Sequence, residues 1–468
     1  MPRLKNLDRE VKTRSGNVRT ITDFLNNEYR QFSQYVISTR CCPSIFDGCK
    51  VGARKLLHAA FHGGLKNGED KKVPTLVGDC YVHTLYQHGD SSLVGTIITL
   101  GAFFEDNLNP LEIIGQGGSL RAPNAVAAPR YLKCKLSKYA KLYKIDEDLL
   151  EYVFDEGEYL EPTHYLPIIP LILTARNEGM APGYKFSSFS YNPIDIIDAC
   201  SEVIKGKEIK TVIRPYVRGI KSKNFVWDGE LSRWINNGEW TFDEKHDTLL
   251  ISDLPYDISY DKFEKKLNKL LDDGTIKIWK DFSQDDAIDY RIGFQKGALS
   301  KYLNSGKKDN LVKMFMLQST VPDDLLYVLD ENNKVHHFLN KEDLITYFVK
   351  LRLQTYAKRK DRLVDIKNKQ LSENNNLCKF IDLIISGKLK INNRPVADVK
   401  KDLDSYELPH SLLSIPLSKL TKEERDALVK KNQVLQDELK YIQETSIDKM
   451  YLNDLAELRK DLIKDFDK

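Results

Sequence analysis

Two long helical patterns in the last third of this chain restrict its fold more than any other sequence feature. Apolar residues recur near the helical period from Leu344 to Ile366, in a long and broken stripe. A second helix is predicted after Thr421-Lys422-Glu423-Glu424, because this stretch has the capping-box pattern. The stripes comprise Leu344, Phe348, Leu351, Tyr356, Leu363 and Ile366 in the first helix, and Leu428, Leu435, Leu439 and Ile442 in the second.

The segment between these two helices contains the apolar run Phe380–Ile385 and loops with Pro395, Pro409 and Pro416. Two antiparallel helices with a small insert at the tip suit a coiled-coil arm that ends in a dimer contact. An ordinary two-helix hairpin packed on its own domain would give the same pattern. The pattern alone leaves both interpretations open.

Length predicts a multidomain protein, and the mixture of helical and strand-like runs along the chain makes the expected fold class mixed α/β. A chain of 468 residues is long enough for about three domains, each with its own core. We expect domains at 1–150, 151–340 and 341–468. Hydrophobic content of 41% and charged content of 30% indicate a soluble globular chain. No apolar run approaches the roughly 18 residues of a membrane span, and the N-terminus lacks the apolar core of a signal peptide.

The seven cysteines are scattered and form no Cys-x-x-Cys pair, and no histidine lies at metal-ligand spacing from them. This pattern favours reduced thiols in a cytosolic compartment and argues against a zinc site. We therefore expect no metal bound by this chain itself.

Charge is segregated along the chain although the net charge is only +3. Residues 1–60 carry eleven Lys/Arg against five Asp/Glu, and 115–145 carry seven against none. Residues 146–161 then carry eight acidic side chains. A nucleic-acid surface on such a chain must come from this local segregation of charge.

The stretch Ala127-Ala128-Pro129-Arg130-Tyr131 opens a basic segment and follows the run Gly115-Gln116-Gly117-Gly118. A tyrosine beside an arginine can carry out covalent chemistry on a phosphodiester. The phenol is the nucleophile, and the guanidinium holds the phosphate oxygens as charge builds on them. A surface strand with a packed ring is the alternative, since the chain has 23 tyrosines.

The first third reads as a helical module. Residues 21–62 show helical periodicity with a break near Cys41-Cys42-Pro43, and Arg54 and Lys55 fall on the second helix. His88-Gly89-Asp90-Ser91 should form a tight turn before another helix over 93–100. Two helices joined by a glycine turn form the helix-turn-helix pattern, whose second helix commonly faces DNA. In isolation, His88 could equally be a locally hydrogen-bonded turn residue.

These pieces together resemble one family. The order Arg40…Pro43…Asp47-Gly48-Cys49-Lys50, then His88-Gly89-Asp90, Gly115-Gln116-Gly117 and Ala127–Tyr131 is similar to the breakage–reunion subunit of type IIA DNA topoisomerases. The resemblance implies a winged-helix domain, an α/β tower domain, and a long antiparallel coiled-coil arm with a small helical dimerisation domain.

The resemblance also implies residue roles. Tyr131 would attack a DNA phosphate to give a 5′-phosphotyrosyl link, and Arg130 would contact that phosphate. Arg40, Lys50 and His88 would gather around the scissile phosphate. A phenol is almost wholly protonated at neutral pH, so its attack needs a base or a metal-assisted route. The remaining DNA-binding candidates are Arg54, Lys55, Ser91, Gln116 and Ile169.

Ile169 belongs to the run Glu161–Leu171, which by itself reads as an irregular buried strand. The run is similar to one in eukaryotic members of the family, where an isoleucine wedges between base pairs and bends the duplex. Ile169 is the matching position, and Ile168 is the alternative. The following region, 165–340, mixes strand-like runs with a helix at Tyr260–Leu271, as a tower domain would. The strand-like runs are Thr248–Ile251, Leu325–Leu329 and Val335–Phe338.

No ATP-binding motif and no acidic cluster of the TOPRIM type occurs in the chain. A separate large subunit is therefore expected to supply the ATPase site and the Mg²⁺ ligands. This split organisation looks most like the medium subunit of T-even-type bacteriophage topoisomerases. The implied protein is a homodimer that cuts double-stranded DNA for duplex passage, in the cytoplasm, or the host cytoplasm if phage-encoded. The alternatives are a DNA-architectural coiled-coil protein that does not cut, and a gyrase-like supercoiling subunit.

Overall fold

The structure is a computed structural model, and it describes residues 10–12, 18–63, 65, 68–231, 233–243, 245–284, 287–298, 308–322, 326–391, 394–416 and 420–466. The chain forms two compact units. The first comprises Met1–Val349 together with Glu457–Lys468, and the second comprises Lys350–Ala456. The second unit is shorter than the predicted 341–468 arm, because the C-terminal residues belong to the first unit. A boundary at residue 150 stays a prediction.

The first unit begins with a short hairpin and a helical arm. Thr20 caps the arm, since its side chain accepts a hydrogen bond from the Asp23 backbone N–H. The arm ends where Cys42 becomes extended ahead of Pro43, so the predicted helix break is confirmed. The elements are β1 (Glu10–Lys12), β2 (Val18–Thr20), α1 (Ile21–Phe24), η1 (Leu25–Tyr29), α2 (Arg30–Val36) and η2 (Ile37–Cys41).

Three helices and a small antiparallel sheet enclose the next core. The helices are α3 (Val51–His62), α4 (Val73–Thr84) and α5 (Asp90–Gly101). The predicted helix-turn-helix is present as α4, a turn and α5, and the turn starts at Leu85, which has a positive φ of 48°. The sheet order is β3–β5–β4, with β3 at Lys71–Lys72, β4 at Leu111–Ile114 and β5 at Lys133–Leu136. Core residues include Leu56, Leu76, Leu93, Ile97, Leu111 and Leu132.

Short 3₁₀ turns and two hairpins follow the sheet. The 3₁₀ turns are η4 (Pro129–Tyr131), η5 (Ala140–Lys144), η6 (Glu147–Leu149) and η7 (Leu171–Leu173). One hairpin pairs β6 (Tyr152–Asp155) with β7 (Glu158–Pro162), and the other pairs β8 (Asn177–Ala181) with β9 (Tyr184–Ser188).

The middle of the chain forms the α/β region that the sequence predicts. Helix α6 (Pro193–Ile204) leads through η8 (Ser222–Asn224) to a three-stranded sheet of order β10–β11–β16 and a four-stranded sheet of order β12–β13–β15–β14. Helix α7 (Tyr260–Asp272) packs through Phe263, Leu267 and Leu270 against Leu249, Ile251 and Tyr290 of the larger sheet. The predicted helix at 260–271 and the strand at 248–251 are confirmed.

The remaining elements of this region are β10 (Phe225–Asp228), β11 (Arg233–Asn237), β12 (Glu239–Asp243), β13 (Thr248–Asp253), β14 (Ile278–Asp281), β15 (Tyr290–Gly293), α9 (Lys308–Met314) and β16 (Gln318–Thr320). A hairpin of β17 (Leu326–Leu329) and β18 (Val335–Phe338) closes it, as predicted. Leu325 of the predicted strand lies outside the described residues.

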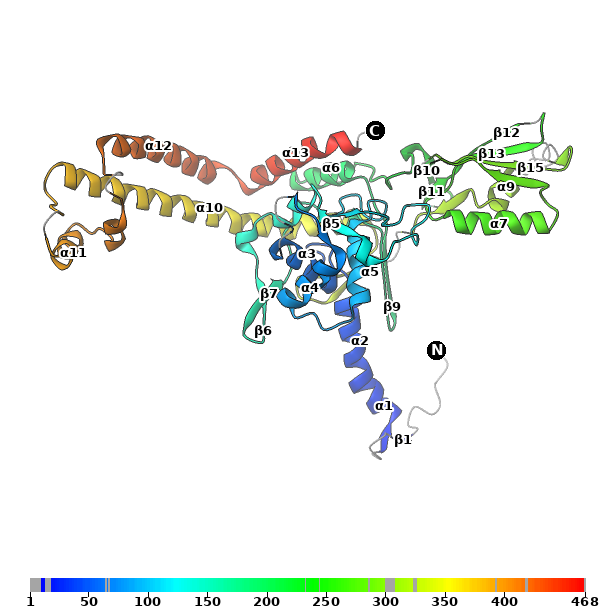
Figure 1. Cartoon of the computed structure of the whole chain (residues 1–468), viewed down its shortest axis with the longest axis horizontal. Helices are drawn as coiled ribbons and strands as arrows, with labels where there is room; N and C mark the ends of the chain where they lie inside the picture. The colour runs from blue at the N-terminus through cyan, green and yellow to red at the C-terminus, as the bar shows by residue number, and fades with distance from the viewer. Residues whose placement is uncertain are drawn as a thin grey trace. The chain divides into compact units, whose positions relative to one another are not determined.

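The second unit is a helical hairpin. Figure 1 shows α10 (Lys341–Ile385) running alongside α12 (Lys422–Glu444). The helices are antiparallel, because Lys367 binds Glu438 while Asn375 binds Asn432 and Arg425 binds Asp382. Thr421 caps α12 by accepting the Glu424 N–H, which confirms the capping box.

The tip of this hairpin has its own small core. Phe380 and Leu383 of α10 pack there with Leu403 of α11 (Val396–Ser405) and with Leu412 of η9 (His410–Ser414). The last helix is α13 (Ile447–Phe466). Among the described residues, no helix is both long enough and apolar enough to cross a membrane.

Candidate nucleic-acid interface

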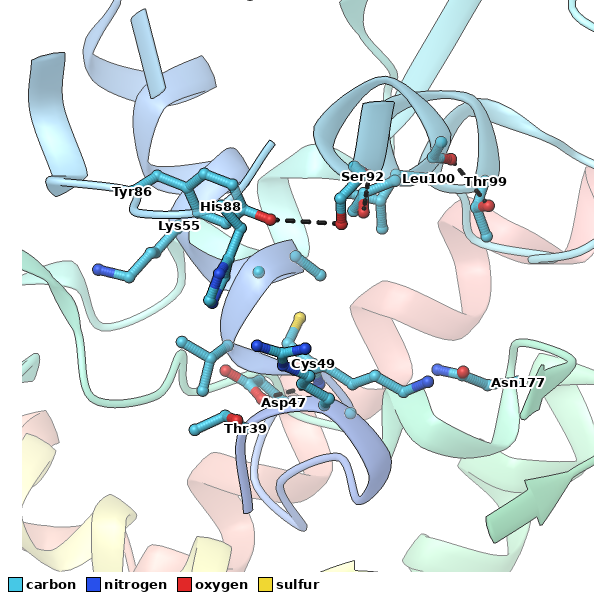
Figure 2. Close-up of a pocket in the computed structure, with 18 of the residues that line it drawn as sticks. Thr39, Asp47, Cys49, Lys55, Tyr86, His88, Ser92, Thr99, Leu100 and Asn177 are labelled. Carbon is cyan, nitrogen blue, oxygen red and sulfur yellow. Dashed lines mark hydrogen bonds between the residues drawn. The ribbon is translucent and has the colours of Figure 1, made fainter. Parts of the chain in front are cut away.

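A cavity of about 920 Å³ in the first unit gathers most of the basic residues that the sequence singles out. Arg40 enters it from η2, Lys50 and Lys55 from the start of α3, and His88 and Ser91 from the turn before α5. Figure 2 shows His88 and Tyr86 on one side of the cavity and Asp47, Cys49 and Thr39 on the other. Five of the ten predicted site residues therefore share one cavity.

The arm and the β8–β9 hairpin are locked together beside this cavity. A Cβ atom on Gly179 would lie 2.2 Å from the carbonyl oxygen of Cys41, so β8 passes η2 at a distance that only glycine allows. One residue earlier, the Glu178 carbonyl accepts a hydrogen bond from the Lys50 Nζ at 2.6 Å. These contacts place Lys50, Arg40 and the hairpin in one wall.

Arg54 does not fit the predicted role of a DNA-backbone contact. It is only 7% exposed, and its guanidinium binds both carboxylate oxygens of Asp47 and the carbonyl of Cys49. The same carboxylate accepts the backbone N–H groups of Cys49 and Tyr165. Arg54 therefore neutralises a buried acid that holds the Asp47–Lys50 turn in shape. Its charge is not available to a phosphate.

The two lysines at the start of α3 are partly buried. Burial lowers the pKa of Lys50, and the nearby Cys41, Cys42 and Glu178 oppose this shift. Lys55 donates to the Glu161 carboxylate at 2.8 Å and to the Thr84 carbonyl at 2.7 Å. A DNA phosphate would have to compete with Glu161 for Lys55. Lys50, which donates to the neutral Glu178 carbonyl, is the more available cation.

His88 is exposed at the cavity rim within an aromatic group. Its Nε2 lies 3.3 Å from the hydroxyl of Tyr35, and its ring packs edge-on against Tyr86. Its backbone carbonyl accepts a hydrogen bond from Tyr81. Ser91 lies in the first turn of α5, where free backbone N–H groups attract anions. The rim thus offers a histidine and a helix N-terminus to a phosphate.

The cavity also contains a buried acid that the sequence did not single out. Burial raises the pKa of Asp106 to about 6, against hydrogen bonds from the Leu108 N–H and the Thr174 hydroxyl. Its neighbour Glu105 also lines the cavity and pairs with Arg176. Sequence signals could not identify Asp106, because its burial depends on segments distant in the chain.

Tyr131 and Arg130 do not line this cavity. They lie in the 3₁₀ turn η4, where the Tyr131 N–H donates to the Ala128 carbonyl. Pro129 at the first position favours this turn. The Tyr131 side chain is 68% exposed, and the Arg130 guanidinium lies 4.7 Å from its ring centre. The phenol is thus free to meet a large substrate, with a cation directly beside it.

The Gly-rich run upstream supports this turn. The Gln116 carbonyl accepts a hydrogen bond from the Ala127 N–H, and Gly117 forms an antiparallel β-bridge with Val126. The exposed loop that carries Gln116 therefore pairs with the residues just before η4. Gly115 has a φ of 111° and faces Leu132, which explains a glycine there.

The basic segment after Tyr131 is less cationic in the fold than in the sequence. Four of its lysines pair with acids from distant segments: Lys133 with Asp70, Lys135 with Glu112, Lys138 with Asp465, and Lys141 with Asp461. Lys144 lies over the ring of Phe61. Arg130 is the cation of this segment that is placed to act on a substrate at Tyr131.

Ile169 does not fit the predicted wedge role. Its side chain has 0% exposure, because the Tyr165–Leu173 run packs into the core of the first unit. An exposed apolar side chain instead lies on the β8–β9 hairpin, where Met180 is 79% exposed one residue after Gly179. Met180 was not among the candidates predicted from the sequence. The signal available in the sequence was an apolar residue directly after a glycine.

Among the described residues, no group of three or more His, Cys, Asp or Glu side chains could hold a metal ion. The residues present therefore do not fit a resident Mg²⁺ site. Three acids in and around the cavity, Asp47, Glu161 and Glu105, are instead paired with Arg54, Lys55 and Arg176.

Comparison with known proteins agrees with this geometry. The family of the A subunits of DNA gyrase and topoisomerase IV matches residues 40–459. The chain belongs to this family and carries the DNA-breakage and reunion domain of type II topoisomerases. The match begins at Arg40 of the cavity and includes Tyr131.

Individual relatives extend the likeness. The chain is 30% identical to DNA topoisomerase 2, mitochondrial, of Dictyostelium discoideum, over 95% of this chain and 35% of that protein. It is 31% identical to DNA topoisomerase 2 of Meyerozyma guilliermondii, over 82% of this chain and 27% of that protein. The chain thus spans between about a quarter and a third of the length of these relatives.

Among solved structures, the fold is similar to the DNA-binding, cleavage and re-ligation domain of Plasmodium falciparum topoisomerase II, with a TM-score of 0.82 and 27% identity. The alignment covers 96% of this chain and 66% of that one.

Proposed function

We propose that this chain is the DNA-cleaving subunit of an ATP-dependent type II topoisomerase, with Tyr131 as its nucleophile. The exposed Tyr131 beside Arg130 is the observation that carries the proposal. In the reaction, the Tyr131 Oη forms a bond to phosphorus and the bond from phosphorus to the 3′-oxygen breaks. The phenolic proton passes to a base, and the 3′-oxygen takes up a proton. The reverse transfer reseals the strand.

The separation between Tyr131 and the cavity suggests that two copies of the chain share each reaction. Arg40, Lys50 and His88 of one copy would hold the phosphate that Tyr131 and Arg130 of the second copy attack. A homodimer would then contain two such composite sites and cut both strands. Lys55 and Ser91 would position the duplex around each site.

Met180 takes the wedge role proposed for this class of enzyme. An apolar side chain that enters a base step unstacks it and bends the duplex. Met180 is exposed on a hairpin that is fixed to the cavity wall through Gly179 and Glu178. The flexible thioether side chain can adapt to different base steps.

In this proposal, a separate partner protein with TOPRIM and ATPase domains binds Mg²⁺ and ATP. No acid cluster of the described residues fits a metal, so we derive no step through Mg²⁺ on this chain. The T-even-type origin and the placement in a host cytoplasm stay predictions.

The experiment is covalent trapping on end-labelled duplex DNA, with a TOPRIM-bearing partner and Mg²⁺ present. Tyr131→Phe should abolish the adduct and leave DNA affinity nearly unchanged, since affinity rests on many phosphate contacts. Arg130→Ala should slow cleavage by roughly 10²–10³-fold, the usual effect of removing a transition-state donor. A DNA-architectural protein would give no adduct in any variant. Gyrase-like activity would appear as negative supercoiling of relaxed plasmid.

A further inference from the structure

The segment that connects α6 to β10 is a second strongly basic part of the first unit, besides the segment after Tyr131. Residues 205–223 contain seven Lys/Arg and one acidic residue, Glu208. Nothing in the proposed cleavage reaction uses these charges. The seven cations are Lys205, Lys207, Lys210, Arg214, Arg218, Lys221 and Lys223.

The connection is held in a defined shape at its start. Gly206 has a φ of 68° and ends α6, with its N–H bonded to the Val203 carbonyl and the Lys207 N–H bonded to the Glu202 carbonyl. The Glu202 carboxylate then accepts the backbone N–H groups of Lys210 and Thr211, at 2.7 and 3.1 Å. A short loop thus carries Lys205, Lys207 and Lys210 around the end of the helix.

The second half of the connection is anchored to the domain core. Arg218 donates to the Asn107 carbonyl and to the Tyr139 hydroxyl, and the Asn107 amide donates to the Tyr216 carbonyl. Tyr216 also packs against Phe466 of α13. These contacts use the Arg218 charge to fix the segment.

Five of the other cations remain available at the surface. Lys205, Lys207 and Lys210 are exposed, and the described residues provide no ion pair for them. Lys221 and Lys223 share Glu239 and are 57% and 71% exposed, and exposed ion pairs contribute only about 0–1 kcal/mol, so a phosphate can compete for these two side chains. Arg214 is different, because it binds both carboxylate oxygens of the buried Asp195, at 2.6 and 2.8 Å.

The helix dipole accounts for only part of this charge. A cation within the last turn stabilises a helix C-terminus, and Lys205 is placed to do so. This effect fades beyond the last turn, so it does not explain Lys210, Lys221 and Lys223. A regular anionic polymer is the ligand that uses a run of separate exposed cations.

The connection does not share a surface with the cavity. In the first unit, α6 lies on the opposite side from α2 and the β8–β9 hairpin, which belong to the cavity wall (Figure 1). The chain passes from one side to the other between two neighbouring residues. Asp106 lines the cavity, while Asn107 makes hydrogen bonds with Arg218 and Tyr216 of the connection. A duplex in the cavity would therefore leave the connection free.

We propose that the α6–β10 connection binds the phosphate backbone of a second DNA duplex, separate from the one that is cut. This inference rests on the proposed function, since strand passage requires two duplexes on one enzyme. Lys205, Lys207 and Lys210 make the principal phosphate contacts, and Lys221 and Lys223 extend them. The contacts are independent of base sequence.

The test is a titration of the full chain with a fluorescent 30-bp duplex at several salt concentrations. Wild type should show two classes of binding. The triple variant Lys205→Gln/Lys207→Gln/Lys210→Gln should keep the first class and weaken the second at least tenfold, with the salt slope reduced by about 1 per lysine. The double variant Arg40→Gln/Lys50→Gln should weaken the first class of binding and keep the second.

A matched control removes three exposed lysines from α7, as Lys262→Gln/Lys265→Gln/Lys269→Gln. Its second binding class should remain. The inference is overturned if the control weakens that class equally, or if the triple variant binds as wild type does. Acetylation followed by mass spectrometry gives a readout without substitution, since excess duplex should protect Lys205, Lys207 and Lys210.

The assay with Mg²⁺ and the TOPRIM-bearing partner separates this inference from the proposed function. The triple variant should cleave a linear duplex at the wild-type rate and decatenate linked circles more slowly. Absence of cleavage in the wild type would contradict the proposed function. Normal cleavage together with normal decatenation in the triple variant would contradict only the second duplex site.

Discussion

Lys50 combines a partly buried position with a proposed role that needs its charge. Burial lowers its pKa, so it loses its proton at a lower pH than an exposed lysine does. Arginine stays protonated throughout the accessible range. We expect DNA binding by the wild type to weaken as pH rises through the lowered pKa of Lys50. The DNA affinity of the Lys50→Arg variant should not change over the same pH range.

The measurement is duplex affinity by anisotropy between pH 7 and 10, with salt held constant. Parallel profiles for the two proteins would show that Lys50 does not contact the phosphate.

Asp106 provides a test of the cavity's electrostatics through stability. Burial raises its pKa to about 6, above the ordinary value near 3.9 in an unfolded chain. Ionisation of Asp106 therefore lowers the free energy of unfolding. This loss is absent below about pH 4 and complete above about pH 6. Asp106→Asn keeps an oxygen for the Leu108 N–H and removes the charge.

We expect Asp106→Asn to stabilise the protein by up to about 3 kcal/mol at pH 7.5 and by only about 1 kcal/mol at pH 4.5. Urea unfolding of both proteins at the two pH values measures this. An equal effect at both pH values would mean that charge is not the cause.

The β8–β9 hairpin carries Met180, to which we now assign the wedge role that the sequence interpretation gave to Ile169. Met180→Ala should reduce DNA bending and leave stability within about 0.5 kcal/mol, because an exposed side chain is removed. Ile169→Ala should instead cost about 2–5 kcal/mol of stability, since it empties a buried site. Energy transfer between dyes at the two ends of a bound duplex measures bending. Normal bending in Met180→Ala would exclude it as the wedge.

Local patterns predicted the elements well, and distant contacts account for the differences. The helix break at Cys42, the turn before α5 and the Thr421 cap each depend on a few adjacent residues, so their sequence signals were sufficient. In the sequence, Arg54 and Ile169 cannot be told apart from exposed candidates. In the fold, Arg54 is buried against Asp47, and Ile169 is buried with the Tyr165–Leu173 run. The lysines after Tyr131 are paired with acids such as Asp465, more than 300 residues away in sequence.

For the whole molecule, self-association is the property that the proposed composite site requires. Exposed apolar side chains at the tip of the second unit, Ile385 and Val396, are candidates for this contact. Burying one such side chain contributes about 1.5–3 kcal/mol, which corresponds to roughly a 10–100-fold change in dissociation constant. Ile385→Asp and Val396→Asp should each weaken the dimer by at least that much.

Val429→Asp on α12 is the matched control, since Val429 is also exposed but lies away from the tip. Sedimentation equilibrium measures all three variants. Unchanged dimers in both tip variants would place the self-association surface elsewhere.

Cleavage chemistry at Tyr131 is the central claim, and peptide mapping of the trapped adduct tests it most directly. The covalent complex is digested with protease and nuclease, and mass spectrometry identifies the tyrosine that carries the nucleotide. We predict one modified peptide, with a 5′-phosphate joined to Tyr131 and none in Tyr131→Phe. A nucleotide on any other of the 23 tyrosines would contradict the claim.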